Sequence, residues 1–181
     1  MGDIFPDLKG PEDPIVSAVA HDSTETQVTL RAVPDKPGVA TRLFTVLAEG
    51  GINVDMIVQA GAATGTVDIS FTLPGSQTDK VHSLLAASRE ALEYRSVDVD
   101  PAVGKVSLIG VGMKNNSGIT ATFFRAMSDR HINVLMISSS EIRISALVPL
   151  KDLDEAVRAV HSAFNLESDQ EQAVVYGGTG R

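Results

Sequence analysis

The 181-residue sequence lacks cysteine and tryptophan, and its aromatic residues amount to six phenylalanines and two tyrosines. Without cysteine, the chain forms neither disulfides nor thiolate metal sites. With so few aromatic rings, a surface that stacks nucleic-acid bases is not expected. No apolar run approaches the roughly 20 residues that span a bilayer, and no basic region followed by an apolar stretch opens the chain. We therefore expect a cytoplasmic protein without a membrane partner.

An excess of positive charge is also missing. The chain has 15 Lys and Arg residues against 23 Asp and Glu residues, which gives a formal net charge of −8. Proteins that bind a phosphate backbone need clustered Lys and Arg, so nucleic acid is not an expected partner. The remaining composition, 43% hydrophobic and 21% charged, is typical of a globular protein.

Motifs of catalysis and of phosphate binding are absent too. The sequence contains neither the G-x-S-x-G turn of a nucleophilic serine nor a G-x-G-x-x-G or G-x-x-x-x-G-K-[ST] phosphate loop. Its four histidines lie far apart without the spacing of metal ligands; they are His21, His82, His131 and His161. We expect no catalytic residue, no metal site and no cofactor.

A repeat about 80 residues long is the main feature that is present. The stretches VTLRAVPDKPGVATRLFTVLAEGGINVDMI and VSLIGVGMKNNSGITATFFRAMSDRHINVLMI share a loop glycine, a helical apolar stripe and an Ile-Asn-Val segment. In the first copy the stripe is Val39, Leu43, Val46 and Leu47, the i, i+4, i+7, i+8 spacing of a helix with one buried face. The repeat is too long for a solenoid unit, so it predicts two copies of one small domain.

Each copy has the same expected order of elements. In the first copy we expect strands at 27–33, 53–59, 67–73 and 96–99, with helices at about 38–49 and 78–92. In the second copy we expect strands at 105–111, 133–138, 142–148 and 173–176, with helices at 118–130 and 151–164. A further strand is expected at 15–20, and the proline-rich residues 1–14 are typical of a linker or arm.

The order β-α-β-β-α-β is the ferredoxin-like pattern, an α+β fold with an antiparallel sheet and both helices on one face. Domains this small bury only about 60% of their chain surface and leave sheet edges open. We therefore expect self-association, with a homodimer as the simplest assembly.

Two polar constellations are candidates for ligand binding. Asp35 lies in the turn before the first helix, where free N–H groups suit a carboxylate and Asp35 could hold an ammonium group; it could equally be an ordinary turn residue. Asn53 and Asp55, with Gln59, could bind a zwitterion from one face of a strand, or simply hydrogen-bond at a strand end. The matching run of the second copy, residues 133–141, ends in Ser138-Ser139-Ser140-Glu141, which a polar turn would also explain.

Five stretches resemble a known family: VPDKPGVA, INVDMIVQ, KVSLIGVGMK, SEIRISALV and AVVYGGTGR. The resemblance as a whole extends over about residues 14–181. These stretches are similar to the C-terminal regulatory region of aspartokinase, of the actinobacterial type, in which that region is also made as a separate β subunit. The resemblance implies two tandem ACT domains. The first would comprise residues 26–100, and the second would comprise 15–22 with 101–178.

The resemblance implies a regulatory function without catalysis by this chain, because nothing in it matches the nucleotide-binding segment of the aspartokinase catalytic half. The implied effectors are threonine, lysine or both, and the implied partners are the catalytic α subunit and a second copy of the chain. By position, the effector-binding residues would be Asp35, Ala40, Asn53, Val54, Asp55, Gln59, Ile119, Thr120, Asn133, Val134, Ser140 and Glu141.

The sequence departs from the family pattern in three places. Ala60-Gly61-Ala62 stands where the family usually has Asn-Val-Ser, Asn115-Asn116-Ser117 stands where it has Ser-His-Pro, and Leu135 stands where it has a glutamate. Losing a polar group from a ligand-facing loop typically costs about 1–3 kcal/mol. We therefore expect weakened feedback control, and the alternative is a structural oligomerisation module that has lost its effector sensing.

Overall fold

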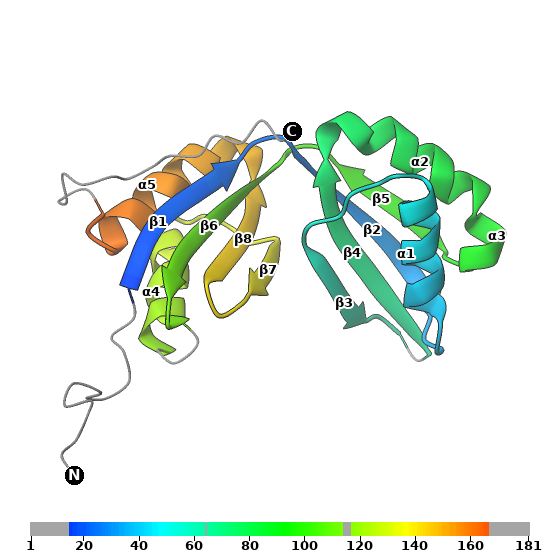
Figure 1. The fold of residues 1–181 in the computed structure, drawn as a ribbon, viewed down its shortest axis with the longest axis horizontal. Coiled ribbons are helices and arrows are strands. Elements are labelled where there is room, and N and C mark those ends of the chain that lie inside the picture. Colours follow the sequence, from blue (N-terminus) through cyan, green and yellow to red (C-terminus); the bar gives the residue numbers. More distant parts are fainter. Residues whose placement is uncertain (1–14, 64, 114–116, 167–181) are drawn as a thin grey trace, which may run out of the picture.

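The computed structural model describes residues 15–63, 65–113 and 117–166. These residues form two units, each a four-stranded antiparallel sheet with helices packed on one face. The strand order is β3-β4-β2-β5 in unit one and β1-β6-β8-β7 in unit two. Figure 1 shows the helices on the two outer flanks and the sheets between them. The α+β, ferredoxin-like prediction is confirmed.

Unit one follows the β-α-β-β-α-β order. Its strands are β2 (Glu25–Pro34), β3 (Ile57–Gly61), β4 (Thr66–Pro74) and β5 (Ser96–Asp100), and its helices are α1 (Val39–Glu49), α2 (Thr78–Ala87) and α3 (Arg89–Leu92). Helix α1 buries Val39, Leu43 and Leu47, which is the stripe that the periodicity predicts. Its N-terminal neighbour Gly38 has φ +91°, a left-handed conformation that glycine adopts without a side-chain clash.

Unit two differs in the origin of one strand. Its elements are β6 (Val103–Val111), α4 (Ser117–Ser128), β7 (Met136–Ser139), β8 (Arg143–Pro149) and α5 (Leu153–Ala163), with β1 (Ile15–Asp22) at the sheet edge. Strand β1 pairs antiparallel with β6, just as β5 pairs with β2 in unit one. A segment from before the first unit therefore completes the second sheet. The expected strand at 173–176 and the arm at 1–14 lie outside the described residues.

Three predicted boundaries are wrong. The strand expected at 53–59 begins only at Ile57. Before it, two residues bond the backbone of one residue on β4: the N–H of Asp55 donates to the carbonyl of Thr72, and the N–H of Thr72 donates to the carbonyl of Met56, so the pairing is irregular there. The strand expected at 133–138 likewise begins only at Met136. The helix expected at 78–92 is broken at Ser88 into α2 and α3.

Each unit has its own apolar core between its sheet and its helices. Phe71 and Leu30 are fully buried in unit one, and Phe123 and Leu108 are fully buried in unit two. The duplication extends to the opposite, helix-free face of each sheet. There Thr29 and Ser70 join their hydroxyls at 2.8 Å, and Ser107 and Ser145 do the same at 2.8 Å in unit two.

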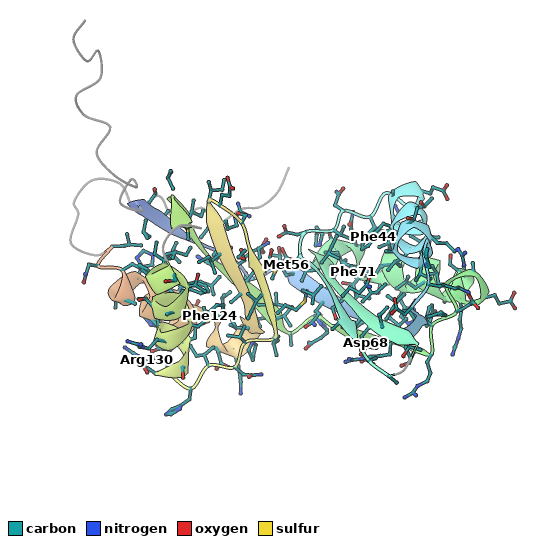
Figure 2. All side chains as sticks on the ribbon, turned by 90° about the horizontal axis from the view of Figure 1, so that it is seen from below. Phe44, Met56, Asp68, Phe71, Phe124 and Arg130 are labelled. Atoms are coloured by element: carbon teal, nitrogen blue, oxygen red, sulfur yellow. The ribbon has the colours of Figure 1, made fainter. Side chains whose placement is uncertain are left out.

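A third, smaller cluster joins the two units. Met56 of unit one packs with Val103, Met136 and Leu147 of unit two, and all four side chains are buried. Figure 2 places Met56 between the two sheets. The segments that connect the units, β1 to β2 and β5 to β6, both cross at one end of the molecule (Figure 1).

An ion cluster lies beside this apolar contact. The ammonium of Lys105, on β6, contacts Glu25 at 2.5 Å and also contacts Asp55, and both carboxylates belong to unit one. Burial of the ammonium lowers the pKa of Lys105, but its hydrogen bonds to Asp55 and Glu25 outweigh burial, so the pKa is raised overall. Lys105 therefore stays charged and links the units electrostatically.

Candidate functional site

The turn before α1 forms the wall of a pocket, which we name the first helix-entrance pocket. It has a volume of about 340 Å³ and is lined by residues 34–41, with Gln59 from β3 and Val67 from β4. The predicted residues Asp35, Ala40 and Gln59 therefore lie together. Helix α1 has no side-chain cap. The N–H of Val39 donates to the carbonyl of Lys36 at 3.4 Å, and the N–H groups that follow it in the first turn can bind an anion at this pocket.

Two charged side chains line this pocket, and they differ in their partners: Lys36 forms an ion pair, whereas Asp35 is exposed. Lys36 is held by Glu93, with 2.5 Å between the ammonium and the carboxylate, and the hydrogen bond from Lys36 lowers the pKa of Glu93. The backbone N–H of Asp35 donates to the carbonyl of Gly65 at 2.9 Å, which fixes the turn. Its side chain stays exposed. The pocket therefore combines a negatively charged side chain with a positively polarised helix end.

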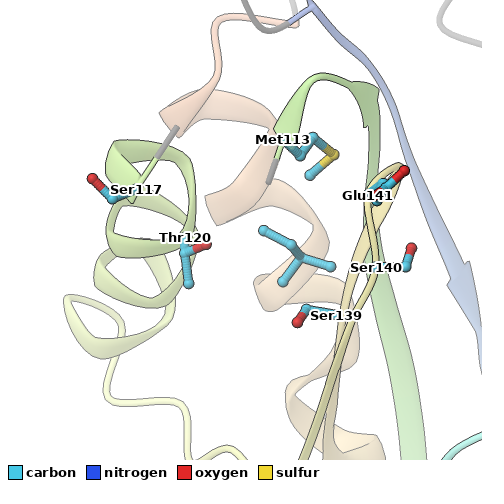
Figure 3. Close-up of a pocket in the computed structure, with 7 residues that line it drawn as sticks. Met113, Ser117, Thr120, Ser139, Ser140 and Glu141 are labelled. Atoms are coloured by element: carbon cyan, nitrogen blue, oxygen red, sulfur yellow. The ribbon is translucent and has the colours of Figure 1, made fainter. Parts of the chain in front are cut away.

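Unit two carries the corresponding pocket at the start of α4, which we name the second helix-entrance pocket. Its volume is also about 340 Å³, and Thr120, Ser140 and Glu141 are among its lining residues. Figure 3 shows Thr120 on α4 facing Ser139 on β7 across the pocket. The remaining lining residues are Met113, Ser117 and Ile144.

The two pockets occupy equivalent places in the duplicated fold. Ala40 and Thr120 lie at the same position of α1 and α4, 80 residues apart, and Gln59 and Ser139 do so on the edge strands. Gln59 pairs with Ile69, and Ser139 pairs with Ile144. Because Ile69 and Ile144 are buried core residues, both edge-strand side chains point to the helix-covered side. Each unit thus presents one polar pocket at its helix entrance.

The other predicted residues lie elsewhere in the described structure. Asn53 lines a separate pocket between the units, and Asp55 contacts Lys105. Asn133 and Val134 line a shallow pocket of about 410 Å³ at the C-terminal end of α4. Two more are mainly core residues: Val54 packs against the core of unit one, and Ile119 is buried in that of unit two. The structure therefore divides the twelve predicted residues among several places.

Some lining residues were missed by the sequence reasoning. Ser139 belongs to the candidate run at 138–141 but was not among the implied effector-binding residues, although it follows Gln59 by the 80-residue repeat. Ser117 likewise follows Pro37, which lines the first pocket, by 80 residues. Met113 had no such signal, since the loop before α4 is two residues longer than its counterpart before α1: Val28 to Gly38 is 10 positions, whereas Val106 to Gly118 is 12. The partnership of Glu25 with Lys105 depends on how the units meet, which neither copy encodes by itself.

Among residues 15–63, 65–113 and 117–166, no three His, Asp or Glu side chains gather as metal ligands. No helix in these ranges is long and apolar enough to cross a membrane.

Comparison with known proteins identifies the family. Residues 31–88 and 106–164 each match the ACT domain. The chain is 44% identical to the aspartokinase of Corynebacterium efficiens over 172 residues, which cover 94% of this chain and 41% of that protein. The chain therefore spans about two fifths of the length of the curated relatives that it matches.

Solved structures agree. A crystal structure of aspartokinase alpha and beta subunits matches with a TM-score of 0.78 and 38% identity, covering 83% of this chain and 99% of that one. The regulatory subunit of aspartate kinase from Thermus flavus matches with a TM-score of 0.77 and 34% identity, covering 82% and 98%. Escherichia coli aspartokinase III in complex with lysine and aspartate matches with a TM-score of 0.67 and 28% identity, covering 84% and 34%.

The match thus runs along nearly all of a regulatory subunit but only 41% of an aspartokinase. This chain belongs to the aspartokinase family, as a regulatory part built from two ACT domains.

Proposed function

We propose that this chain senses threonine, lysine or both in its two helix-entrance pockets and thereby controls aspartokinase activity in the cytoplasm. In this proposal the first ACT domain comprises residues 26–100, and the second comprises 15–22 with 101–178. The effectors would be end products of the pathway that aspartokinase opens, so binding would provide feedback inhibition.

The equivalence of the two helix-entrance pockets carries this proposal. Each has a volume of about 340 Å³, within the range of small-molecule sites. Each combines the start of a helix with polar side chains from the adjoining edge strand. A free amino acid has a carboxylate for the helix N-terminus and an ammonium group that a carboxylate such as Asp35 or Glu141 can accept.

We further propose that the chain acts as a homodimer or together with a catalytic α subunit. The crystal structure of aspartokinase alpha and beta subunits supports the second partner. The exposed edge-strand residues Ile57 and Ile137 support self-association, since 48% and 50% of their surfaces face solvent and apolar edges favour a partner. A ligand alters such an assembly only by its difference in affinity for the two arrangements.

The alternative is an oligomerisation module whose effector sensing is weakened or lost. Asp55, one of the implied effector residues, contacts Lys105 within the chain, and Leu135 replaces a family glutamate on the surface. Both observations reduce the polar groups that an effector could meet. The same binding experiment separates the alternatives.

The test is calorimetric titration of the purified chain with threonine, with lysine and with their mixture. Asp35→Ala should weaken binding at the first pocket at least about tenfold, because a lost charged hydrogen bond costs about 1.5–3 kcal/mol. Glu90→Ala is the matched control: it removes an exposed carboxylate of unit one that lines neither pocket. Absence of binding by the folded wild-type chain would favour the oligomerisation module, and equal affinity in both variants would move the site away from Asp35.

A further inference from the structure

A pocket larger than either helix-entrance pocket lies elsewhere in the described structure. It has a volume of about 910 Å³ and lies at the end of the molecule where the connecting segments cross. Its walls come from the β1–β2 connection, the start of α2, and Asn53 and Pro101. We name it the junction pocket, because both connections between the units contribute to it.

A buried carboxylate in its wall is only half satisfied. Glu25 is 6% exposed, and one of its oxygens, Oε1, accepts a hydrogen bond from Lys105 at 2.5 Å. The second oxygen, Oε2, is buried and has no hydrogen-bond partner among the described residues. A buried carboxylate oxygen without a donor is costly, so this oxygen is suited to a ligand that brings an N–H group.

The helical segment that begins at Gly75, whose N-terminal end favours a negative charge, lies close to Glu25. Gly75, which opens the 3₁₀ turn before α2, donates its N–H to the carbonyl of Thr24 at 2.6 Å. The hydroxyls of Thr26 and Thr78 meet at 2.9 Å. The residues on both sides of Glu25 are therefore bonded to the start of α2, which holds the helix start next to the carboxylate.

The helix start itself is uncapped. Neither the 3₁₀ turn nor α2, a helix of 10 residues, receives a side-chain cap, although Ser76 and Gln77 line the pocket. Gln77 cannot serve as a cap, because its side chain bonds Asn53 and Gly51.

The N–H of Gly75 donates to Thr24, and that of Thr78 donates to Gly75. The N–H groups of Ser76 and Gln77 have no hydrogen-bond acceptor among the described residues. Helix N-termini attract anions through free N–H groups and the helix dipole, so these two groups give the pocket an anion-binding end.

We propose that the junction pocket binds a small molecule that carries an ammonium group and a carboxylate at opposite ends, at a site separate from the helix-entrance pockets. The ammonium group donates to Oε2 of Glu25, and the carboxylate accepts from the N–H groups of Ser76 and Gln77 in the 3₁₀ turn that leads into α2. The lining agrees with this orientation, since it includes the carboxylates of Asp22 and Glu25 and no Lys or Arg. The occupied pocket would brace the junction of the two units.

Matched probes test this pairing of charges. Calorimetry on the full chain would use ω-amino acids from glycine to 5-aminopentanoate, with butylamine and butyrate as probes that carry only one of the two charges. We expect saturable binding for at least one ω-amino acid and at least tenfold weaker binding of both single-charge probes. Binding of butylamine as tight as that of every ω-amino acid would overturn the proposal, as would no binding of any probe.

Variants locate the site. Glu25→Gln should weaken ω-amino acid binding at least tenfold, and Ser76→Asp, which puts a competing carboxylate at the helix start, at least fivefold. Asp55→Asn is the control, because it also takes one carboxylate from Lys105 but does not line the pocket; its affinity should stay within twofold. Circular dichroism checks folding, and Ser76→Asp decides the matter if Glu25→Gln is unfolded.

The proposal for the junction pocket and the proposal for the helix-entrance pockets can be refuted separately. Asp35→Ala, which changes the first helix-entrance pocket, should leave ω-amino acid binding within twofold. Unchanged binding in folded Glu25→Gln and Ser76→Asp would refute the junction site and leave the proposed effector function standing.

Discussion

The two units have cores of the same design, but the helix-free faces of their sheets carry different charged residues. In both, a pair of hydroxyls joins the central strands, Thr29 with Ser70 and Ser107 with Ser145. Two positions further along β2, unit one has Arg31, which bonds Asp68 at 2.9 Å and Asp98 at 2.7 Å.

In the part of unit two that the structure describes, no such ion cluster lies at the corresponding position. The strand registers equate Leu30, paired with Ile69 and Val97, with Leu108, paired with Ile144 and Val19. Arg31 then corresponds to Ile109, Asp68 to Arg143 and Asp98 to Ala20. The duplicated fold has thus kept the pairing of these strands, whereas the three residues of the unit-one ion cluster are replaced by Ile109, Arg143 and Ala20 in unit two.

A second difference lies where the sheet contacts the start of a helix, α2 after β4 in unit one and α5 after β8 in unit two. In unit one, Thr26 and Thr78 meet through a hydrogen bond. By the same registers, the equivalent residues in unit two are Gly104 and Leu153, and here the leucine side chain covers the glycine: a Cβ on Gly104 would lie 2.7 Å from Leu153 Cδ2. One copy uses a polar contact at this place, and the other uses close apolar packing.

The largest expected effect tests whether the two cores unfold together in one cooperative transition. Phe71→Ala and Phe123→Ala each empty a fully buried site, and each should lower the free energy of unfolding by about 3–5 kcal/mol. Because Met56, Met136 and Leu147 form a cluster shared by both units, we expect one cooperative transition in urea in either variant. Two separate transitions, with only one shifted in each variant, would show that the units unfold independently.

An intermediate effect tests the contact over Gly104. Gly104→Ala forces its Cβ against Leu153, which is buried, and overpacking of this kind costs about 1–3 kcal/mol. In unit one the matched change is Thr26→Val, which removes the hydrogen bond to Thr78 while keeping the shape and should cost about 0.5–1.5 kcal/mol.

Chemical denaturation of the double variant Gly104→Ala/Leu153→Ala sharpens this test. Shortening Leu153 removes the clash, so the double variant should be more stable than the sum of the two single losses implies. Additive losses would show that Leu153 moves aside freely and that the contact over Gly104 is not tight.

The helices and the duplication could be predicted from the sequence, because a buried helix face leaves a periodic apolar stripe. The α1 stripe of Val39, Leu43 and Leu47 is an example. The starts of the strands were harder to predict. Asp55 and Met56 both bond the backbone of one residue on β4, Thr72, so regular pairing begins only at Ile57, and this irregularity depends on a residue distant in sequence. The break in the helix at Ser88 leaves no comparable signal, since the apolar spacing continues to Leu92.

The first helix-entrance pocket was partly predictable, because Asp35 and Ala40 are neighbours in sequence and the turn that holds them has proline and glycine signals. Contacts between units were not. Lys105 reaches Glu25 and Asp55 only because the two sheets meet at a particular angle, and the repeat pattern describes each unit alone. The junction pocket escaped notice for the same reason.

The smallest expected effect concerns the charged face of unit one and its dependence on pH. The N–H of Ala32 donates to Asp68 at 2.8 Å, and this bond, with that from Arg31, lowers the pKa of the Asp68 carboxyl. A carboxyl whose pKa is lower in the folded chain stabilises the fold above its unfolded pKa, about 3.9. That contribution is lost as the pH falls through the folded value.

Asp68→Asn keeps an oxygen for Ala32 but removes the charge. Because Arg31 is nearly half exposed, we expect a loss of only about 0.5–1 kcal/mol at pH 7. The difference from wild type should shrink as the pH falls from about 4 to 2, where the wild-type carboxyl is itself protonated. Arg143→Gln, at the equivalent position of unit two, should change stability by less than about 0.5 kcal/mol at any pH, since Arg143 is exposed and has no ion pair among the described residues. Urea denaturation from pH 2 to 8 measures both; a loss in Asp68→Asn that stays constant over this range would show that the charge of Asp68 does not stabilise unit one.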